Sequence, residues 1–516
     1  MIAGKKIYDP ISAVHNQIWY HGMRSRNETL SLFKNEGDFL VRTTTFGIKF
    51  QFIISVCTES KKGTPIEVRH LSLYYCYTTH VWSLMTLKKK KAQSCSKSKS
   101  NSQMEMIPKK FRSATDLVQH YQKEPIYKKI VLKNPIPRPK WIIPTSLIMF
   151  TSDEPLGKGN FANVLKARMR IADSKDKRKG YIFVAVKMLL EKSDSEGTTE
   201  QERDEGRDSM MREAKVMQRY SHKNVINFFG VACEKPPISL VLEFCPGGSL
   251  ESHLKKFGDG ILASERVQYM LESARGLRYL HHHHCIHRDL AARNVLISAE
   301  GIIKIADFGL SKVLDKNDIE DVDNINKNVP LRWMAPETIS KEPRFSNKSD
   351  VWSYGVMCYE IFNNGIKPWA DIEQLKIISR AIRAGTMPSP PSKTPLCIVN
   401  LIKECWNLAM NERPEFYEIV RKICTIQENE ADLKPPNSSQ FTVNSIHGVH
   451  RLDKTESAEE MLALKSVEHL NSMRDSSNKV SQDSKETKSK ESAEDSFLKR
   501  KKGKVGLLNK QIPTSS

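Results

Sequence analysis

The sequence predicts a multidomain α+β protein, in which two folded blocks are joined by a stiff connector and followed by a polar tail. The chain has 516 residues, which is enough for about two to four domains. The connector, residues 134–140, carries three prolines at alternate positions, so it should be extended and fairly stiff. From about residue 430 onward, Ser, Lys, Glu, Asp and Asn dominate, and such a segment buries too little apolar surface to offset its ordering entropy.

These changes in composition place the expected domain boundaries. We expect an N-terminal extension over residues 1–18, a small folded block over 19–127 with a basic insertion near 88–103, a proline-rich linker over 128–145, a large folded block over 146–427 and a disordered polar tail over 428–516.

The chain is strongly basic, with a formal net charge of +21. Residues 84–140 hold 15 Lys and Arg against 3 Asp and Glu, and the centre of this excess is the run Lys88–Lys91. This basic insertion is either a solvated loop or a surface for an acidic partner or an anionic membrane, and the sequence leaves both open. The net charge is the only feature that suggests nucleic acid binding, so we expect none.

Cysteine usage and hydropathy indicate a cytoplasmic protein. The ten cysteines form no C-x-x-C pair, which is typical of a reduced, intracellular, zinc-free chain. No apolar run reaches the roughly 18 residues of a membrane span, so we expect no transmembrane segment. The basic insertion is the feature that would allow peripheral contact with the inner face of the plasma membrane.

In the large block, a glycine-rich segment lies between two strand-like runs: Leu156, Gly157, Lys158, Gly159, Asn160, Phe161, Ala162, Asn163 and Val164. Glycines let a hairpin backbone approach phosphates closely. Shortly afterwards a strand ends in Lys187, and by strand alternation this lysine shares a face with Phe183 and Ala185. A lysine inside an apolar strand calls for a carboxylate, and Glu213 on the next helix is the candidate.

Three further polar side chains lie next to short apolar strands. Asp289 and Asn294 belong to the run His-Arg-Asp-Leu-Ala-Ala-Arg-Asn, and Asp307 opens Asp-Phe-Gly. Carboxylate and amide oxygens are the ligands that Mg²⁺ takes when it also bridges phosphates. A further carboxylate that does not bind the metal can orient a hydroxyl group and accept its proton.

This ordered set of motifs resembles the protein kinase family over about 280 residues. The resemblance implies that the glycine-rich segment covers ATP, that Lys187 holds its α- and β-phosphates and pairs with Glu213, and that Glu243 and Cys245 face adenine. It also implies that Asp289 is the catalytic base and that Asn294 and Asp307 bind Mg²⁺.

The same resemblance favours tyrosine as the acceptor. The cation after the catalytic base is Arg293, four residues on, as in tyrosine kinases, and residues 330–337 resemble their substrate-binding segment. Two departures stand out: Ala162 replaces the last loop glycine, and the activation segment, residues 310–336, contains no Tyr or Thr. We therefore expect that Arg288 takes an acidic residue of this segment in place of a phosphate; the candidates are Asp315, Asp318, Glu320, Asp321 and Asp323.

The small block contains a candidate anion pocket. In the strand 37–42, Leu40 and Arg42 share one face while Phe39 and Val41 share the other, and a guanidinium on such a face needs an anion. With the opening Trp-Tyr-His-Gly and His70, the block resembles an SH2 domain, a central antiparallel sheet flanked by two helices. The resemblance implies that Arg42 binds phosphotyrosine, with Arg26, His70 and hydroxyls of residues 43–45 around it. The alternative is a structural Arg42 in a degenerate SH2 fold.

An SH2 domain followed directly by a bilobal tyrosine kinase domain resembles a shortened member of the Fes/Fer non-receptor kinases. The expected protein uses ATP and Mg²⁺, phosphorylates protein tyrosine and docks phosphotyrosine-containing partners. The rival interpretation is a catalytically weak scaffold that acts mainly through phosphotyrosine binding. The departures at Ala162 and in the activation segment favour the rival, whereas retention of the catalytic residues favours the enzyme.

Overall fold

The computed structural model describes residues 14–46, 49–60, 66–76, 78–87, 104–106, 109–158, 162–171, 180–190, 200–313, 330–340 and 342–434. The basic insertion and the segment after residue 434 lie outside these residues. Within the described part of the chain, no helix is both long and apolar enough to cross a membrane.

The N-terminal domain is built on a six-stranded sheet with the order β5-β4-β3-β2-β1-β6. Its pairs are antiparallel except β1 with β6, which is parallel. Its elements are α1 (Arg26–Leu30), β1 (Asp38–Phe46), β2 (Lys49–Glu59), β3 (Glu67–Cys76), β4 (Val81–Leu87), β5 (Met104–Met106), α2 (Ala114–Lys123) and β6 (Asn134–Pro135). The expected central sheet with two helices is therefore present, although one strand joins in parallel.

The two faces of this sheet have separate apolar cores, as strand alternation predicts. Phe39 and Val41 pack in the larger core, together with the inward side of α2. Leu40 packs with Phe33 in a smaller core on the opposite face. Arg42 has the parity of Leu40 and is 6% exposed, so the strand carries this guanidinium into a buried position.

The proline-rich linker is extended, as predicted, but it is bound at both ends. Its first part forms β6 beside β1, and the Ile136 amide donates to the Phe39 carbonyl (2.8 Å). Its last part runs beside strand β10 (Phe228–Ala232), where the Ile143 amide donates to the Val231 carbonyl (2.9 Å). Asn134–Pro135 thus join the N-terminal sheet and Leu132 packs in its core, so this domain extends past the expected boundary at residue 127.

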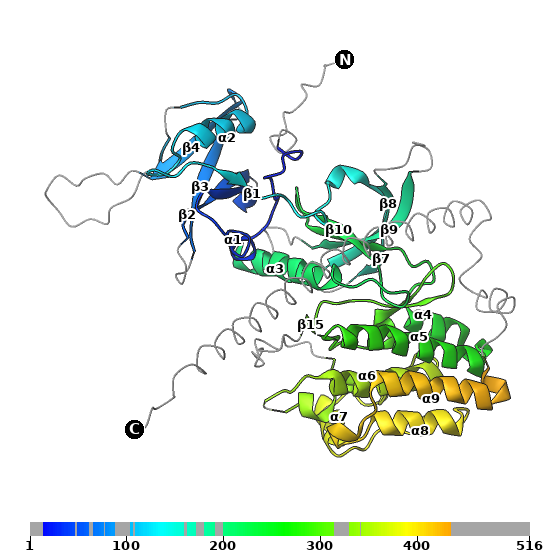
Figure 1. Cartoon of the computed structure of the whole chain (residues 1–516). Coiled ribbons are helices and arrows are strands. Elements are labelled where there is room, and N and C mark those ends of the chain that lie inside the picture. The colour runs from blue at the N-terminus through cyan, green and yellow to red at the C-terminus, as the bar shows by residue number, and fades with distance from the viewer. Residues whose placement is uncertain are drawn as a thin grey trace, which may run out of the picture. The chain divides into compact units, whose positions relative to one another are not determined.

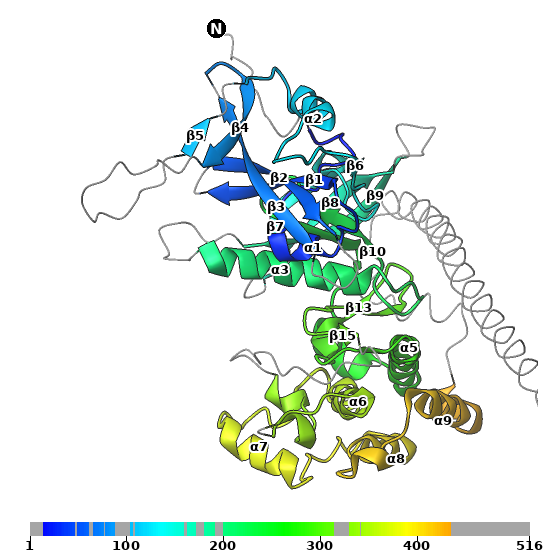
Figure 2. The same cartoon turned by 60° about the vertical axis from the view of Figure 1, so that its left-hand side comes forward.

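The second domain begins with a five-stranded antiparallel sheet of order β10-β11-β9-β8-β7. The other strands are β7 (Ile148–Lys158), β8 (Ala162–Arg170), β9 (Tyr181–Leu189) and β11 (Ser239–Glu243), and one long helix, α3 (Glu200–Met217), packs beside them. Figures 1 and 2 show this helix running along the sheet. A sheet with one helix is what positions the lysine and the carboxylate described below.

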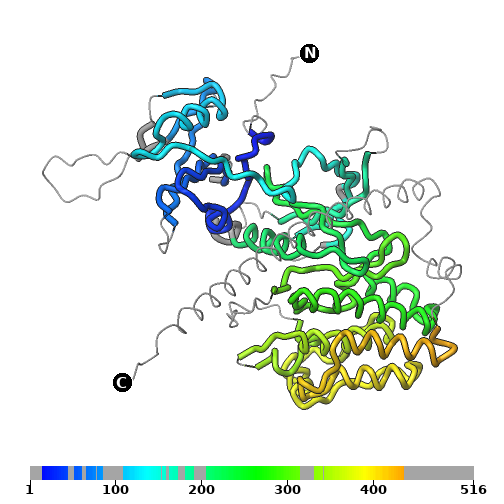
Figure 3. Tube along the Cα trace, in the orientation of Figure 1, coloured from blue at the N-terminus to red at the C-terminus, as the bar shows by residue number. Residues whose placement is uncertain are grey.

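A helical lobe follows in the chain, visible in Figure 3 as the green-to-orange tube. It contains α4 (Leu250–Phe257), α5 (Ala263–His282), α6 (Asn347–Phe362), α7 (Leu375–Arg383), α8 (Leu396–Cys405) and α9 (Phe416–Asn429), with the short strand pairs β12 (Cys285–Ile286) with β15 (Lys312–Val313) and β13 (Val295–Ile297) with β14 (Ile303–Ile305). Helix α6 is buried along most of its length, so every polar side chain on it needs a partner.

Ion pairs and hydrogen bonds link the five-stranded sheet and α3 to the N-terminal domain within one compact unit of the chain; for example, the Met23 amide donates to the Cys233 carbonyl (2.7 Å). Lys215 of α3 lies 3.1 Å from a carboxylate oxygen of Glu28 on α1. Arg138 of the linker lies 3.2 Å from Glu234, which follows β10.

The helical lobe extends past the residue at which we expected the polar tail to start. Helix α9 ends at Asn429, a short 3-10 helix spans Ala431–Leu433, and Leu433 is 4% exposed against the main core. Residues 428–434 therefore pack on the domain, and the boundary at 428 is too early.

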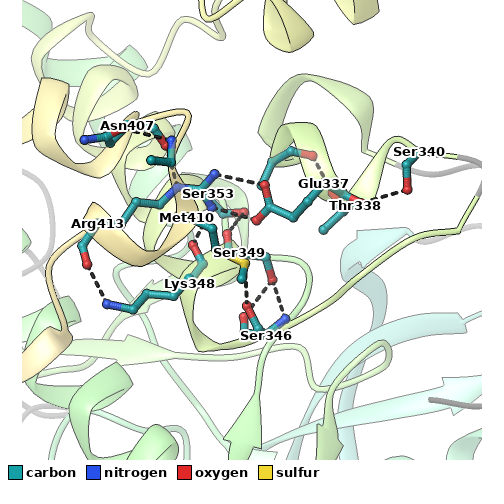
Figure 4. Close-up of polar contacts among 12 residues, drawn as sticks. Glu337, Thr338, Ser340, Ser346, Lys348, Ser349, Ser353, Asn407, Met410 and Arg413 are labelled. Atoms are coloured by element: carbon teal, nitrogen blue, oxygen red, sulfur yellow. Dashed lines mark hydrogen bonds and ion pairs between the residues drawn. The ribbon is translucent and has the colours of Figure 1, made fainter. Parts of the chain in front are cut away.

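A buried ion pair ties the end of the activation segment to the helical lobe. Arg413, which is 1% exposed, donates through two nitrogens to the carboxylate of Glu337, at 2.6 and 2.9 Å. Figure 4 shows this pair among the hydroxyls of Ser346, Ser349 and Ser353, which cap and line the start of α6. The bidentate geometry is the favourable one for a buried pair.

Candidate functional site

A lysine–carboxylate pair lies between the sheet and α3. Strand alternation buries Ile182, Val184 and Val186 and leaves Lys187 on the other face. The Lys187 ammonium lies 2.9 and 3.1 Å from the two carboxylate oxygens of Glu213, so the predicted pair is formed. Burial lowers the pKa of Lys187, but Glu213 and Asp307 outweigh it and raise the pKa above its ordinary value, which keeps the ammonium charged.

The Asp-Phe-Gly segment brings a second carboxylate to the same lysine. Asp307 has a φ of 61°, in the left-handed region that non-glycine residues adopt mostly at functional sites. Its Oδ1 lies 3.2 Å from Lys187 Nζ. Phe308 is 1% exposed and stacks on Tyr220. This buried phenylalanine fixes the turn that points Asp307 toward the lysine.

The catalytic-loop residues gather around Asp289. Arg293 donates to Oδ1 of Asp289 (2.6 Å), and the Asn294 amide donates to Oδ2 (2.8 Å). Asn294 is fixed further by a bond to the Asp289 carbonyl (2.7 Å). The structure thus brings together the base, the cation and the amide that the sequence predicted.

Asp350 of α6 anchors this loop, a role that sequence reasoning missed. Its Oδ2 accepts from the His287 amide (2.7 Å) and from His281 Nε2 (2.9 Å), and its Oδ1 accepts from the Arg288 amide (2.9 Å). Burial raises the pKa of Asp350, but the hydrogen bond and charge of His281 and the contacts of His287 lower it below its usual value. The available signal in the sequence for such a role was a carboxylate on a largely apolar helix.

The glycine-rich hairpin connects β7 and β8. Gly157 pairs with Val164 and Lys158 with Asn163, and a β-carbon on Gly157 would meet no atom within 4 Å, so the hairpin is open on that side. Ala162 is 7% exposed. The predicted nucleotide-binding residues Gly159, Asn160 and Phe161 lie outside the described residues.

Glu243 and Cys245, the two residues predicted to face adenine, have different surroundings. The Glu243 carboxylate accepts from the Asn227 amide (3.1 Å) and lies 3.1 Å from Lys304 Nζ. It is therefore engaged in an ion pair, and the Glu243 amide donates to the Asn227 carbonyl (2.9 Å); the adenine contact of this residue stays a prediction. Burial raises the pKa of Cys245 well above its ordinary value, which suits a packing role for that thiol.

Arg288 precedes Asp289, the predicted catalytic base, and has a φ of 69°. Its guanidinium sits 3.9 Å above the centroid of the Phe345 ring, a cation–π contact. The five acidic candidates for an anion substitute, residues 315–323, lie outside the described residues, so that expectation stays a prediction.

A second candidate site lies on the N-terminal sheet. Burial lowers the pKa of His70 to about 4, and the charges of Arg42 and Arg26 act in the same direction. Ser55 Oγ lies 2.8 Å from His70 Nδ1 and orients the ring. The Arg42 guanidinium also contacts the Arg24 carbonyl (3.4 Å). The buried guanidinium of Arg42 is thus the candidate group for an anion on this face of the sheet, whereas Arg26 is exposed.

One predicted contributor points elsewhere. The Thr43 hydroxyl lies 2.6 Å from the buried Tyr20 hydroxyl, because alternation places Thr43 with Val41 and not with Arg42. The hydroxyl of Thr43 therefore belongs to the core face and not to the anion site.

Comparisons with known proteins match both the kinase motifs and the region before them. A family model described as "Protein tyrosine and serine/threonine kinase" matches residues 150–423. The chain is 30% identical over 416 residues to "Tyrosine-protein kinase Fer" of Homo sapiens, covering 80% of this chain and 44% of the human protein. It thus spans less than half the length of that relative.

Two shorter relatives are covered more fully. The identity is 30% over 416 residues to "Tyrosine-protein kinase transforming protein Fps" of Avian sarcoma virus (strain PRCII), covering 80% of this chain and 68% of the viral protein. It is 30% over 421 residues to "Fer-related kinase 1" of Caenorhabditis elegans, covering 80% of this chain and 94% of the nematode protein. With a family model over more than half of its length and relatives that it covers this fully, the chain belongs to the family of protein tyrosine and serine/threonine kinases.

Proposed function

We propose that this chain is a protein tyrosine kinase that transfers the γ-phosphoryl group of ATP to tyrosine residues of proteins. The observation that carries the proposal is the assembled pair of Lys187 and Glu213, with Asp307 at 3.2 Å from the same ammonium. Kinases need the lysine, the helix carboxylate and the metal-binding aspartate in place at the same time. Two of the relatives named above are themselves called tyrosine-protein kinases.

The donor set fits Mg²⁺. Asn294 and Asp307 would hold the ion through an amide oxygen and a carboxylate, which are hard oxygen ligands. When bound, Mg²⁺ neutralises the charge that develops on the ATP phosphates.

The protein's own residues would then orient the reactants. Lys187 binds the α- and β-phosphates, and Asp289 accepts the proton of the tyrosine hydroxyl. Arg293 holds Asp289 through Oδ1 while its guanidinium stacks 4.4 Å above the Trp333 ring. Because Trp333 belongs to the expected substrate-binding segment, this stack supports tyrosine as the acceptor.

The test compares a tyrosine peptide with matched serine and threonine peptides, using the full chain and Mg-ATP. We expect phosphorylation of the tyrosine peptide alone and a fall of about 10²–10⁴-fold in the Asp289→Asn variant. Equal turnover by the wild type and the Asp289→Asn variant would contradict the assignment of the catalytic site. A preference for the serine or threonine peptide would contradict tyrosine as the acceptor.

We further propose that the N-terminal domain is an SH2 domain that docks phosphotyrosine partners. The observations in favour are the burial of Arg42, the contact of Ser55 with His70, and the effect of the Arg42 and Arg26 charges on the pKa of His70. If the kinase site proves weak, this docking alone would be the main activity, as in the scaffold interpretation. Phosphotyrosine-peptide titration of the full chain separates the two activities.

A further inference from the structure

One buried carboxylate of the helical lobe touches both sides of the proposed active site. Glu360, on α6, is 1% exposed. Its Oε2 accepts from the Ala292 amide of the catalytic loop (2.9 Å) and from Trp333 Nε1 of the substrate-binding segment (3.0 Å). A single oxygen therefore joins two segments that are about 40 residues apart in the chain.

The contacts continue from this oxygen to the reacting group. The Trp333 ring lies under the Arg293 guanidinium (4.4 Å), and Arg293 donates to Asp289 (2.6 Å). The loop amide of Ala292 adjoins the same arginine in sequence. Both hydrogen bonds of Glu360 thus restrain groups that contact Arg293, one through the backbone and one through the indole.

We propose that Glu360 is a positioning residue, which holds the catalytic loop against the substrate-binding segment and thereby fixes Arg293 on the catalytic Asp289. This inference rests on the proposed kinase function. A carboxylate at this depth is expensive to bury unless it is hydrogen-bonded. Two N–H donors are what a carboxylate satisfies and an apolar side chain leaves unpaired.

The electrostatic surroundings agree with a functional carboxylate. Burial raises the pKa of Glu360 to about 7, and Glu251 of α4 acts in the same direction, whereas the Trp333 and Ala292 hydrogen bonds and the charge of Arg293 oppose it. Glu251 is itself paired with Lys255. Glu360 is therefore charged above about pH 7 and neutral below it. The hydrogen bonds that it accepts from Ala292 and Trp333 weaken as the pH falls.

The primary test is the Glu360→Gln variant of the full chain, assayed on a tyrosine peptide. Charge-assisted hydrogen bonds are about twice as strong as neutral ones, so we expect kcat to fall about tenfold while KM for ATP changes by less than about twofold. The pH dependence of kcat between 6 and 8 should be flatter in the variant than in the wild type. Glu265→Gln is the matched control, because Glu265 is a buried carboxylate of α5 that accepts from Tyr269.

A second variant guards against a folding defect. Trp333→Phe keeps an aromatic ring under Arg293 and removes the Nε1 donor. If the two groups act together, the double variant should lose no more than about the larger single effect. Independent effects that multiply, or an unchanged kcat in Glu360→Gln, would overturn the proposal.

Hydrogen exchange separates this inference from the proposed function. In Glu360→Gln, amide exchange should rise together in peptides covering 288–296 and 330–336, and neither should change in Glu265→Gln. Exchange that is unchanged in both segments would overturn the inference even in an active enzyme. A wild-type protein that phosphorylates no peptide yet shows the coupled exchange would overturn the kinase function and leave Glu360 as the residue that joins the two segments.

Discussion

Replacing Asp350 by Asn should loosen the catalytic loop and destabilise the helical lobe. The carboxylate accepts three hydrogen bonds, two at Oδ2 and one at Oδ1. An amide can accept at one position only. Its better orientation keeps the two bonds at the Oδ2 position, and its NH₂ group then faces the Arg288 amide with donor against donor.

The magnitude follows from these contacts. One buried N–H left without an acceptor costs about 1–3 kcal/mol, and the loss of charge weakens the two remaining bonds. Breaking a buried charged arrangement in this way costs about 3–5 kcal/mol, which corresponds to a fall in Tm of about 6–20 °C for a domain of this size. Since Arg288 adjoins Asp289, kcat should fall as well.

Thermal unfolding and peptide phosphorylation of the full chain measure both effects. Asp371→Asn, an exposed carboxylate of the same lobe, is the control and should change neither. The folded pKa of Asp350 is below the unfolded value, so its contribution is present above about pH 4 and is lost as the pH falls further; the two proteins should therefore converge in stability at low pH. A Tm within about 2 °C of the wild type at pH 7 would refute this reasoning.

Three other predictions concern the two candidate sites. Lys187→Met should nearly abolish turnover because Glu213 and Asp307 lose their shared cation, and wild-type kinetics in this variant would contradict the nucleotide site. Arg42→Ala should remove phosphotyrosine-peptide binding, measured by calorimetry on the full chain, since the phosphate loses a bidentate partner; an unchanged affinity would rule out the pocket. Phosphatase treatment should leave most of the activity, because the activation segment has no Tyr or Thr and Arg288 already contacts Phe345; a large loss would contradict this unless the phosphate maps to Ser311 or outside the segment.

Local pattern was sufficient to predict where several site residues lie. Alternation along single strands placed Lys187 and Arg42 on their correct faces, because a strand's period of two holds whatever packs against it. Glu213 was predicted as the partner of Lys187 because a buried lysine calls for a carboxylate, and a helix with a suitable one follows in the chain. These predictions depend only on neighbouring elements.

Partners from distant elements were not predictable in the same way. The sequence around Asp350 and Glu360 shows charges on an apolar helix, but not which amides they accept from, because those lie about 27–68 residues away in the chain. Likewise, the sequence did not show that tertiary packing brings Lys304 to the carboxylate of Glu243. The end of the second domain was misplaced because Leu433 is a single apolar residue after a polar run.

The docking of the linker on β10 has a consequence for how this protein is produced in parts. Strand β10 is the outermost strand of its sheet, and Trp141 and Ile143 satisfy the Val231 amide and carbonyl. A fragment that starts at Ser146 would leave these backbone groups unpaired on an exposed edge, where another molecule can add a strand. Such a fragment should self-associate, and a start point before Trp141 should yield a better-behaved enzyme.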